Sequence, residues 1–116
     1  MSQKTCQRKV FRIKYPETDR PRLSTGGVTF EVIDCSESGL RYQLGEAAAP
    51  AVSKTVQGQV SFGCGETTEI SGYVLRVQDG LVAVRFAKSI PAVVMLREQR
   101  WLRDRAAQQA LAAAAK

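Results

Sequence analysis

The sequence predicts an all-β domain, a small six-stranded antiparallel β-barrel, followed by one C-terminal helix. From Val28 to Phe86, apolar residues recur at every second position in short runs that glycine-containing turns separate. This is the spacing of half-buried strands. After Ser89-Ile90-Pro91 the apolar residues follow helical intervals instead. A succession of short antiparallel strands covers its edges most easily by closing into a small barrel.

The composition is that of one globular domain. The chain has 116 residues, of which 44% are hydrophobic and 24% are charged, and this length provides one core and not two. No apolar run approaches the roughly 20 residues that span a bilayer, and the N-terminal segment lacks the apolar stretch of a secretory signal. We expect a cytoplasmic protein without membrane insertion. It divides into a flexible arm (1–7), a domain (8–105) and an alanine-rich tail (106–116).

The strands expected from the pattern are separated by polar or glycine-rich connections. A first extended segment runs from Arg8 to Tyr15, and a loop follows from Glu17 to Gly27 with a short extended piece around Arg22 and Leu23. The later strands are expected at 28–33, 40–44, 55–62, 67–77 and 81–86, with Gly72 marking a bend or bulge. Asp79-Gly80 is a strong hairpin signal.

The C-terminal helix is expected from about Pro91 to Arg105, with Trp101 near its end. Proline is common in the first helical turn, and arginines near the C-terminus suit the helix dipole. The tail from Ala106 has a high helix propensity but little to bury. It could extend the helix, fray or meet a partner, and we favour fraying.

The residue inventory argues against an enzyme. The chain has no histidine, which removes Ser-His and Cys-His nucleophiles and the usual general base near neutral pH. Its three cysteines, Cys6, Cys35 and Cys64, lie far apart without a Cys-x-x-Cys pair, so no metal site is expected. For Cys35 we favour an inert, buried side chain over a reactive thiol.

The net charge of +6 is concentrated at the two ends of the chain. Residues 1–22 carry +5, residues 23–96 carry −2 and residues 97–116 carry +3. Basic end segments are typical of proteins with an anionic partner, such as a nucleotide, a nucleic acid or a lipid head group. The alternative is a solvated segment that keeps the protein soluble.

The most informative stretch is Asp34-Cys-Ser36-Glu-Ser-Gly39, which separates two alternating apolar runs. Asp and Ser side chains can bind turn amides and still present an acceptor outward, and Gly39 permits a positive φ or the close approach of a ligand to the backbone. From these residues alone, a binding turn and an ordinary hairpin turn remain equally open.

The motif Arg8-x-x-x-Arg12, followed by Asp34-x-Ser36-x-x-Gly39, resembles the paired signature of the PilZ domain family. The later strand pair Ile70–Val77 and Leu81–Phe86 and the closing helix are also similar, so the resemblance covers roughly residues 8–105. It implies a six-stranded barrel that binds the bacterial second messenger cyclic di-GMP as its ligand, with no other cofactor.

The ligand chemistry agrees with the roles that this resemblance implies. Arginine forks suit phosphate oxygens and the O6/N7 edge of guanine, which makes Arg8 and Arg12 the expected clamps. The Asp34 carboxylate complements guanine N–H donors, Ser36 adds a hydroxyl contact, and Gly39 lets the backbone pass close to the base. Lys9 either adds charge toward a phosphate or remains solvated.

One position departs from the commoner family pattern, and it leaves the ligand stoichiometry open. Members often have a basic residue before the first motif arginine, where this chain has Gln7.

A receptor of one domain would signal by binding an effector protein of unknown identity. Two alternatives remain: a PilZ-type interaction module that needs no nucleotide, and a basic barrel that binds nucleic acid. The small number of exposed aromatic residues expected for base stacking argues against the latter.

Overall fold

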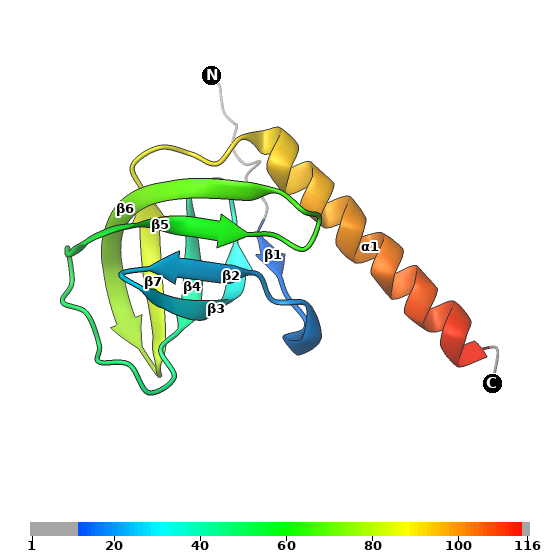
Figure 1. Ribbon diagram of the computed structural model, residues 1–116, viewed down its shortest axis with the longest axis horizontal. Coiled ribbons are helices and arrows are strands. Elements are labelled where there is room, and N and C mark those ends of the chain that lie inside the picture. Colours follow the sequence, from blue (N-terminus) through cyan, green and yellow to red (C-terminus); the bar gives the residue numbers. More distant parts are fainter. Residues whose placement is uncertain (1–11, 115–116) are drawn as a thin grey trace, which may run out of the picture.

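The computed structural model describes residues 12–114, and its strands form the predicted barrel (Figure 1). Six strands close the barrel in the order β3-β2-β5-β6-β7-β4, because β4 also pairs with β3. All of these pairings are antiparallel. The barrel strands are β2 (Arg22–Thr25), β3 (Val28–Cys35), β4 (Gly39–Gln43), β5 (Thr55–Ser61), β6 (Thr67–Gln78) and β7 (Leu81–Phe86).

A seventh short strand, β1 (Ile13–Lys14), pairs with β3 outside the closed barrel. A single 3-10 turn, η2 (Glu17–Asp19), connects it to β2. The first strand predicted from Arg8 to Tyr15 is therefore seen at Ile13–Lys14, and residues 8–11 lie outside the described part of the chain.

The short extended piece expected around Arg22 and Leu23, within a loop from Glu17 to Gly27, is the strand β2. Its four residues pair with both β3 and β5, so it is a full barrel strand. Leu23 is its one large apolar residue and is completely buried, and one apolar residue is too few to show a period of two. Gly26 and Gly27 both have positive φ, as a type I′ hairpin turn requires, and they join β2 directly to β3.

The Asp79-Gly80 hairpin is confirmed, whereas the bulge considered for Gly72 lies farther along the strand. Asp79 and Gly80 both have positive φ between the paired residues Gln78 and Leu81. The irregularity in β6 lies between Val74 and Arg76 and not at Gly72. A Cβ on Gly72 would lie 2.0 Å from the Arg85 carbonyl oxygen, so this glycine permits the close approach of β7.

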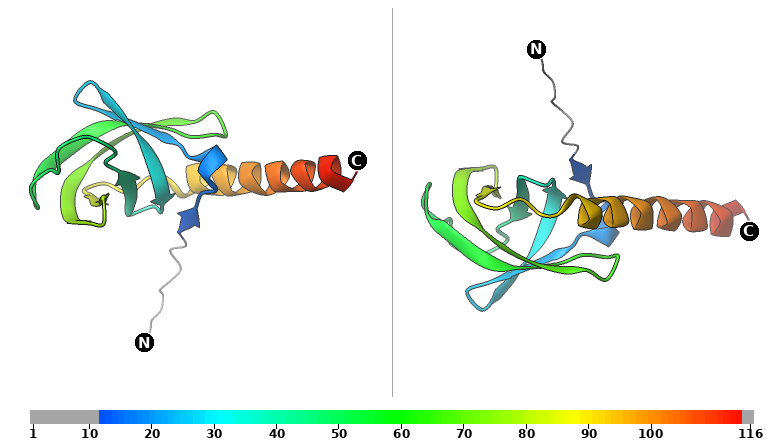
Figure 2. Two further views of the ribbon diagram at one scale, coloured as in Figure 1. Left: turned by 90° about the horizontal axis from the view of Figure 1, so that it is seen from below. Right: turned by 90° about the horizontal axis from the view of Figure 1, so that it is seen from above.

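Helix α1 (Ala92–Ala114) follows the barrel and continues well beyond it (Figures 1 and 2). The helix was expected to end near Arg105 and the tail to fray. Both expectations are wrong, because the helix continues to Ala114. Alanine has the highest helix propensity, and extending an existing helix avoids the cost of nucleation. Within residues 12–114, no helix is long and apolar enough to cross a membrane.

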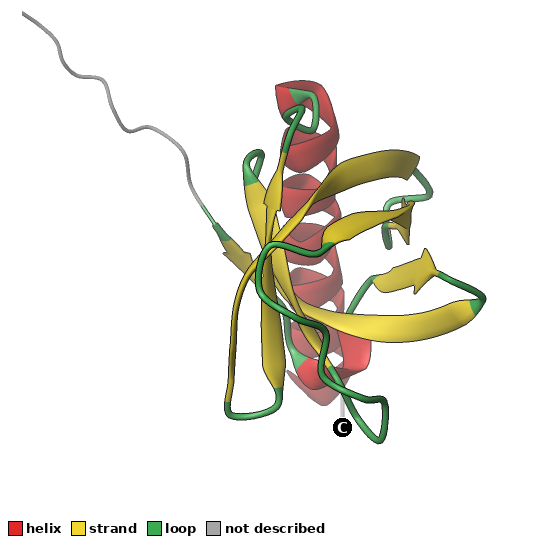
Figure 3. Ribbon diagram, turned by 90° about the vertical axis from the view of Figure 1, so that its left-hand side faces the viewer, coloured by secondary structure: helices red, strands yellow, loops and turns green. Residues whose placement is uncertain are grey.

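The first half of α1 packs against the barrel through Val94 and Met95, which join the core. One turn later the buried Glu98 carboxylate accepts hydrogen bonds from the backbone N–H groups of Gly63 (3.3 Å) and Cys64 (3.0 Å) in the β5–β6 turn. The Trp101 ring lies over Gly63, where a Cβ would approach it to 2.3 Å. Figure 3, turned by 90° from the view of Figure 1, shows the strands in front of the helix.

Cys35 ends β3 inside the core and has no exposed surface. Burial raises the pKa of its thiol to about 12, although the nearby Arg12 opposes this shift. A thiol with such a pKa is almost entirely protonated near neutral pH and reacts slowly. The expected burial of Cys35 is confirmed, and its inertness stays a prediction.

We expect Glu98→Ala to destabilise the domain by roughly 1–3 kcal/mol, because two backbone donors lose their acceptor. Chemical denaturation measures this loss. Gln99→Ala is the control, since Gln99 is exposed on the same helix turn and should change stability by less than about 0.5 kcal/mol. Equal losses for the two variants would contradict the role assigned to Glu98.

We also expect Cys35 to resist alkylation by iodoacetamide in the folded protein. The partly exposed Cys64 should be modified faster, and both should react alike in denaturant. Peptide mass spectrometry over a time course measures the two rates. Rapid native labelling of Cys35 would show that its thiol is accessible.

Candidate functional site

The pairing of β1 with β3 brings together the two halves of the motif found in the sequence. Ile13 lies opposite Cys35 and Lys14 lies opposite Asp34. Arg12 therefore enters the strand pair next to Asp34, although 22 residues separate them in the chain. The β3–β4 hairpin places a second arginine, Arg41, directly across from Asp34.

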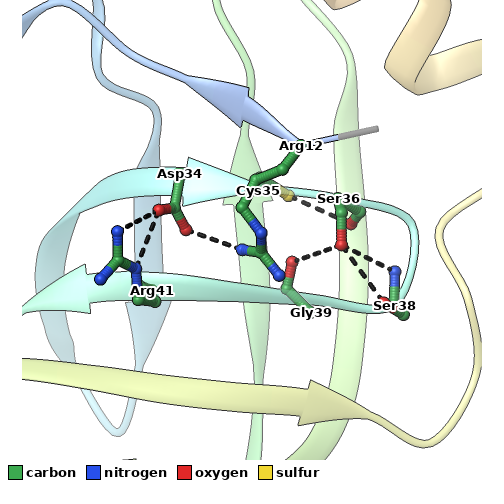
Figure 4. A network of polar contacts seen from close by, with 7 residues as sticks. All are labelled: Arg12, Asp34, Cys35, Ser36, Ser38, Gly39 and Arg41. Atoms are coloured by element: carbon green, nitrogen blue, oxygen red, sulfur yellow. Dashed lines mark hydrogen bonds and ion pairs between the residues drawn. The ribbon is translucent and has the colours of Figure 1, made fainter. Parts of the chain in front are cut away.

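The Asp34 carboxylate is completely buried between these two arginines (Figure 4). Its Oδ1 accepts a hydrogen bond from Arg12 Nη1 at 2.7 Å. Its Oδ2 accepts two bonds from Arg41, from Nε at 2.8 Å and from Nη2 at 2.5 Å. A buried carboxylate requires such partners, because an unpaired buried charge is very costly.

Both arginines keep access to solvent while they hold Asp34. Their side chains are 41% and 37% exposed for Arg12 and Arg41. The hydrogen bonds to Asp34 raise the pKa of Arg41, so this guanidinium stays charged at any physiological pH. Two cations and one carboxylate leave a net positive charge at the surface.

The hydrogen bonding of Asp34 leaves one acceptor position open. A carboxylate oxygen accepts about two hydrogen bonds, so Oδ2 is fully used by Arg41 and Oδ1 has one position left. Asp34 has no exposed surface in this arrangement. A ligand could therefore reach Oδ1 only if the Arg12 side chain moved.

Ser36 organises the turn between β3 and β4. Its hydroxyl accepts a bond from the Ser38 backbone N–H (3.3 Å) and lies 3.4 Å from the Gly39 carbonyl oxygen, to which it donates. It is 1% exposed. The turn role expected from the sequence is thus seen, and a direct ligand contact of Ser36 stays a prediction.

Gly39 is needed for close packing and not for a left-handed backbone. It is not one of the glycines with positive φ. A Cβ at this position would lie 2.5 Å from the carbonyl oxygen of Val84 on β7. The positive φ considered for this glycine is therefore wrong, and the close approach of a ligand to its backbone stays a prediction.

A shallow hollow of about 280 Å³ extends from Arg12 across β4, β7 and β6. Ala83 forms part of its floor, because it is the strand partner of both Arg41 and Arg76 and its side chain is small. The exposed Leu75 adds an apolar surface. Asp34 is the one acidic residue of the lining, and the basic ones are Arg12, Lys14, Arg41, Arg76 and Arg85. We call this surface the basic hollow.

A larger hollow of about 880 Å³ lies elsewhere, over β5 and β6. Its lining is mostly uncharged and polar, with one basic residue, Lys88, and one acidic residue, Glu69. Such a lining has no net charge with which to attract an anion. The basic hollow is therefore the better candidate site despite its smaller volume.

The structure places the predicted site residues in three groups. Arg12, Asp34 and Gly39 line the basic hollow. Ser36 lies behind it in the turn, whereas Ser38 reaches its wall. Arg8 and Lys9 lie outside the described residues.

Four basic residues of the hollow were not predicted: Lys14, Arg41, Arg76 and Arg85. Their sequence signal is weak, because each is simply a polar residue in an alternating strand. Arg41 was the easiest of the four to predict from the sequence, since a hairpin around residues 36–38 places it near Asp34. Lys14 required the pairing of β1 with β3, and Arg76 and Arg85 required the barrel register.

The segment that carries Arg12 also contacts helix α1. The buried Tyr15 hydroxyl has no hydrogen-bond partner of good geometry in the described structure. Burial, together with the adjacent Glu98 carboxylate, raises its pKa. Farther along, Asp19 pairs with Arg105 at 2.8 Å, and Arg105 lies over the Trp101 ring. Movement of this segment would therefore change its contacts with α1.

Comparisons with known proteins agree with this architecture. The family model of the PilZ domain matches residues 7–104. The fold resembles that of an uncharacterized Legionella protein, Lpg0364, with a TM-score of 0.56 and 19% identity over 82% of this chain and 96% of the other. No curated protein sequence matches the chain.

A second structural neighbour is YcgR from Escherichia coli, solved in complex with c-di-GMP. Its TM-score is 0.61 with 15% identity, and the match covers 95% of this chain but 51% of YcgR. At these identities the two neighbours show the shared fold. Because the family model spans both halves of the motif and most of α1, the chain belongs to the PilZ domain family.

Proposed function

We propose that this domain binds cyclic di-GMP in the basic hollow and acts as a receptor that passes the signal to an effector protein. The observation that carries the proposal is the pairing of β1 with β3, which joins Arg12 and Asp34 into one site. The structural neighbour YcgR was solved with the same nucleotide. Such a receptor would act in the bacterial cytoplasm.

The charges of the hollow fit the ligand. Cyclic di-GMP has two phosphates and two guanines, and the hollow has five basic side chains against one carboxylate that is already paired. Arginine forks can bind phosphate oxygens or the guanine O6/N7 edge in a bidentate manner. Leu75, 47% exposed, provides an apolar surface on which a flat base can lie.

Binding would exchange the partner of Asp34. In the proposed complex, Arg12 leaves Oδ1 for a phosphate or a base, and a guanine N–H donates to Oδ1 in its place. Arg41 keeps Oδ2 and holds the carboxylate in orientation through two bonds. Arg8 and Lys9 are proposed as additional ligand contacts at the N-terminal end of the domain, and Ser36 supports the turn.

The signal would leave the site through helix α1. The Arg12 segment continues into Tyr15 and Asp19, which lie against Glu98 and Arg105 of the helix. A shift of Arg12 toward the ligand therefore acts on residues that contact α1. Conformational switches in proteins commonly consist of two packed elements that can exchange one set of contacts for another.

We expect Arg12→Ala and Asp34→Ala each to weaken cyclic di-GMP binding by about tenfold or more, because charge-assisted hydrogen bonds contribute roughly 1.5–3 kcal/mol each. Isothermal titration calorimetry measures the affinities. Arg22→Ala removes the same charge from exposed β2, outside the hollow, and should leave the affinity nearly unchanged. Wild-type binding by both site variants would overturn the assignment.

Asp34→Ala also separates guanine recognition from general attraction to anions. Removing the carboxylate makes the hollow more positive, so a polyanion such as single-stranded DNA should bind equally well or better while cyclic di-GMP binding falls. Fluorescence anisotropy with both probes, over a series of salt concentrations, tests this. A parallel loss for both probes would indicate a damaged fold, and retention of both would favour a nucleic-acid-binding barrel.

A further inference from the structure

The face of α1 that points away from the barrel carries apolar side chains at both ends. Val93 is 51% exposed, Leu96 is 55% exposed and Leu111 is 70% exposed. Val93 and Leu111 are 18 residues apart, or five helical turns at about 100° per residue, so they point in the same direction. Val94 and Met95, which enter the core, point to the other side. We call this the outer face of α1.

Two opposite charges lie between the apolar ends of this face. Arg100 and Asp104 are both exposed and deviate by about 20° from the direction of Val93 and Leu111. Within residues 12–114, neither takes part in a salt bridge. The order along the outer face is therefore apolar, basic, acidic, apolar. Val93 precedes Arg100 by the same interval at which Asp104 precedes Leu111.

We propose that the outer face of α1 binds the same face of a second copy of the chain, in an antiparallel helix pair. A two-fold axis that crosses the helix pair at the level of residue 102 brings Val93 against Leu111 of the partner subunit. The same axis brings Arg100 against Asp104 of the partner subunit. Each contact occurs twice, as in any two-fold interface. One symmetry operation therefore covers the apolar ends and pairs the free charges.

The shape of the molecule permits this pairing. Beyond the barrel, residues 106–114 of the helix are all exposed, and the helix projects past the strands (Figures 1 and 2). Within residues 12–114, the barrel packs against the opposite face of the first half and leaves Val93, Arg100 and Leu111 exposed. Ala107 is small enough for two helices to approach closely. A parallel pair is disfavoured, because Arg100 would meet its own copy.

The family match ends at residue 104, whereas α1 continues to Ala114 and carries Leu111 in that extension. The proposed dimer is therefore a property of this helix and not of the barrel. It stands independently of the nucleotide site.

Charge reversal tests the register. Analytical ultracentrifugation over a concentration series should show a dimer for the wild type. Arg100→Asp and Asp104→Arg should each weaken it by about tenfold or more, because like charges then face each other at two places. An equimolar mixture of the two variants should restore a dimer, since every opposed pair becomes complementary again. An effect confined to one helix cannot produce this restoration.

Leu111→Glu tests the apolar contact without risk to the fold, because its side chain lies in solvent. It should abolish the dimer, whereas Gln109→Glu, which adds the same charge on the opposite side of the helix, should not. Circular dichroism confirms equal helicity. A monomeric wild type at all concentrations, single variants that dimerise like the wild type, or a mixture that stays monomeric would overturn the proposal.

Discussion

The buried Asp34 carboxylate is the interaction on which the site depends. It holds Arg12 from the segment before β1 and Arg41 from β4, so one side chain of β3 connects three parts of the chain. A buried charge must be paired, and this requirement fixes the positions of both guanidinium groups. The same pairing keeps two cations at the surface beside a carboxylate with one free acceptor position. The structural role of Asp34 and its proposed binding role thus fall on a single residue.

Helix α1 depends on a second buried carboxylate in much the same way. Glu98 binds two backbone N–H groups of the β5–β6 turn and lies against Tyr15. Tyr15 follows closely on Arg12, so the two buried acids sit at the two ends of one short segment. That segment packs on the barrel core through Ile13 and Tyr15, which gives the proposed ligand site a physical connection to the helix.

Much of the candidate site could be predicted from the sequence, because its motif residues have fixed spacings around one turn. Asp34 and Gly39 were predicted from that turn, and Arg12 from its place in the paired motif. The burial of the Ser36 hydroxyl and the close approach of β7 to Gly39 were not predicted, since both are properties of packing. Arg76 and Arg85 lie on strands far along the chain, and alternation says which face they occupy but not which residues they meet.

The sequence by itself determined the all-β class, the closing helix, most strand positions and the basic character of the ends, because these follow from local periodicity and composition. The tertiary structure decided that β2 is a barrel strand, that β1 joins β3, and that the helix runs to Ala114. It also decided that five basic side chains share one hollow. Those features depend on strand register and barrel closure, which involve residues distant in sequence and leave little trace in any local pattern.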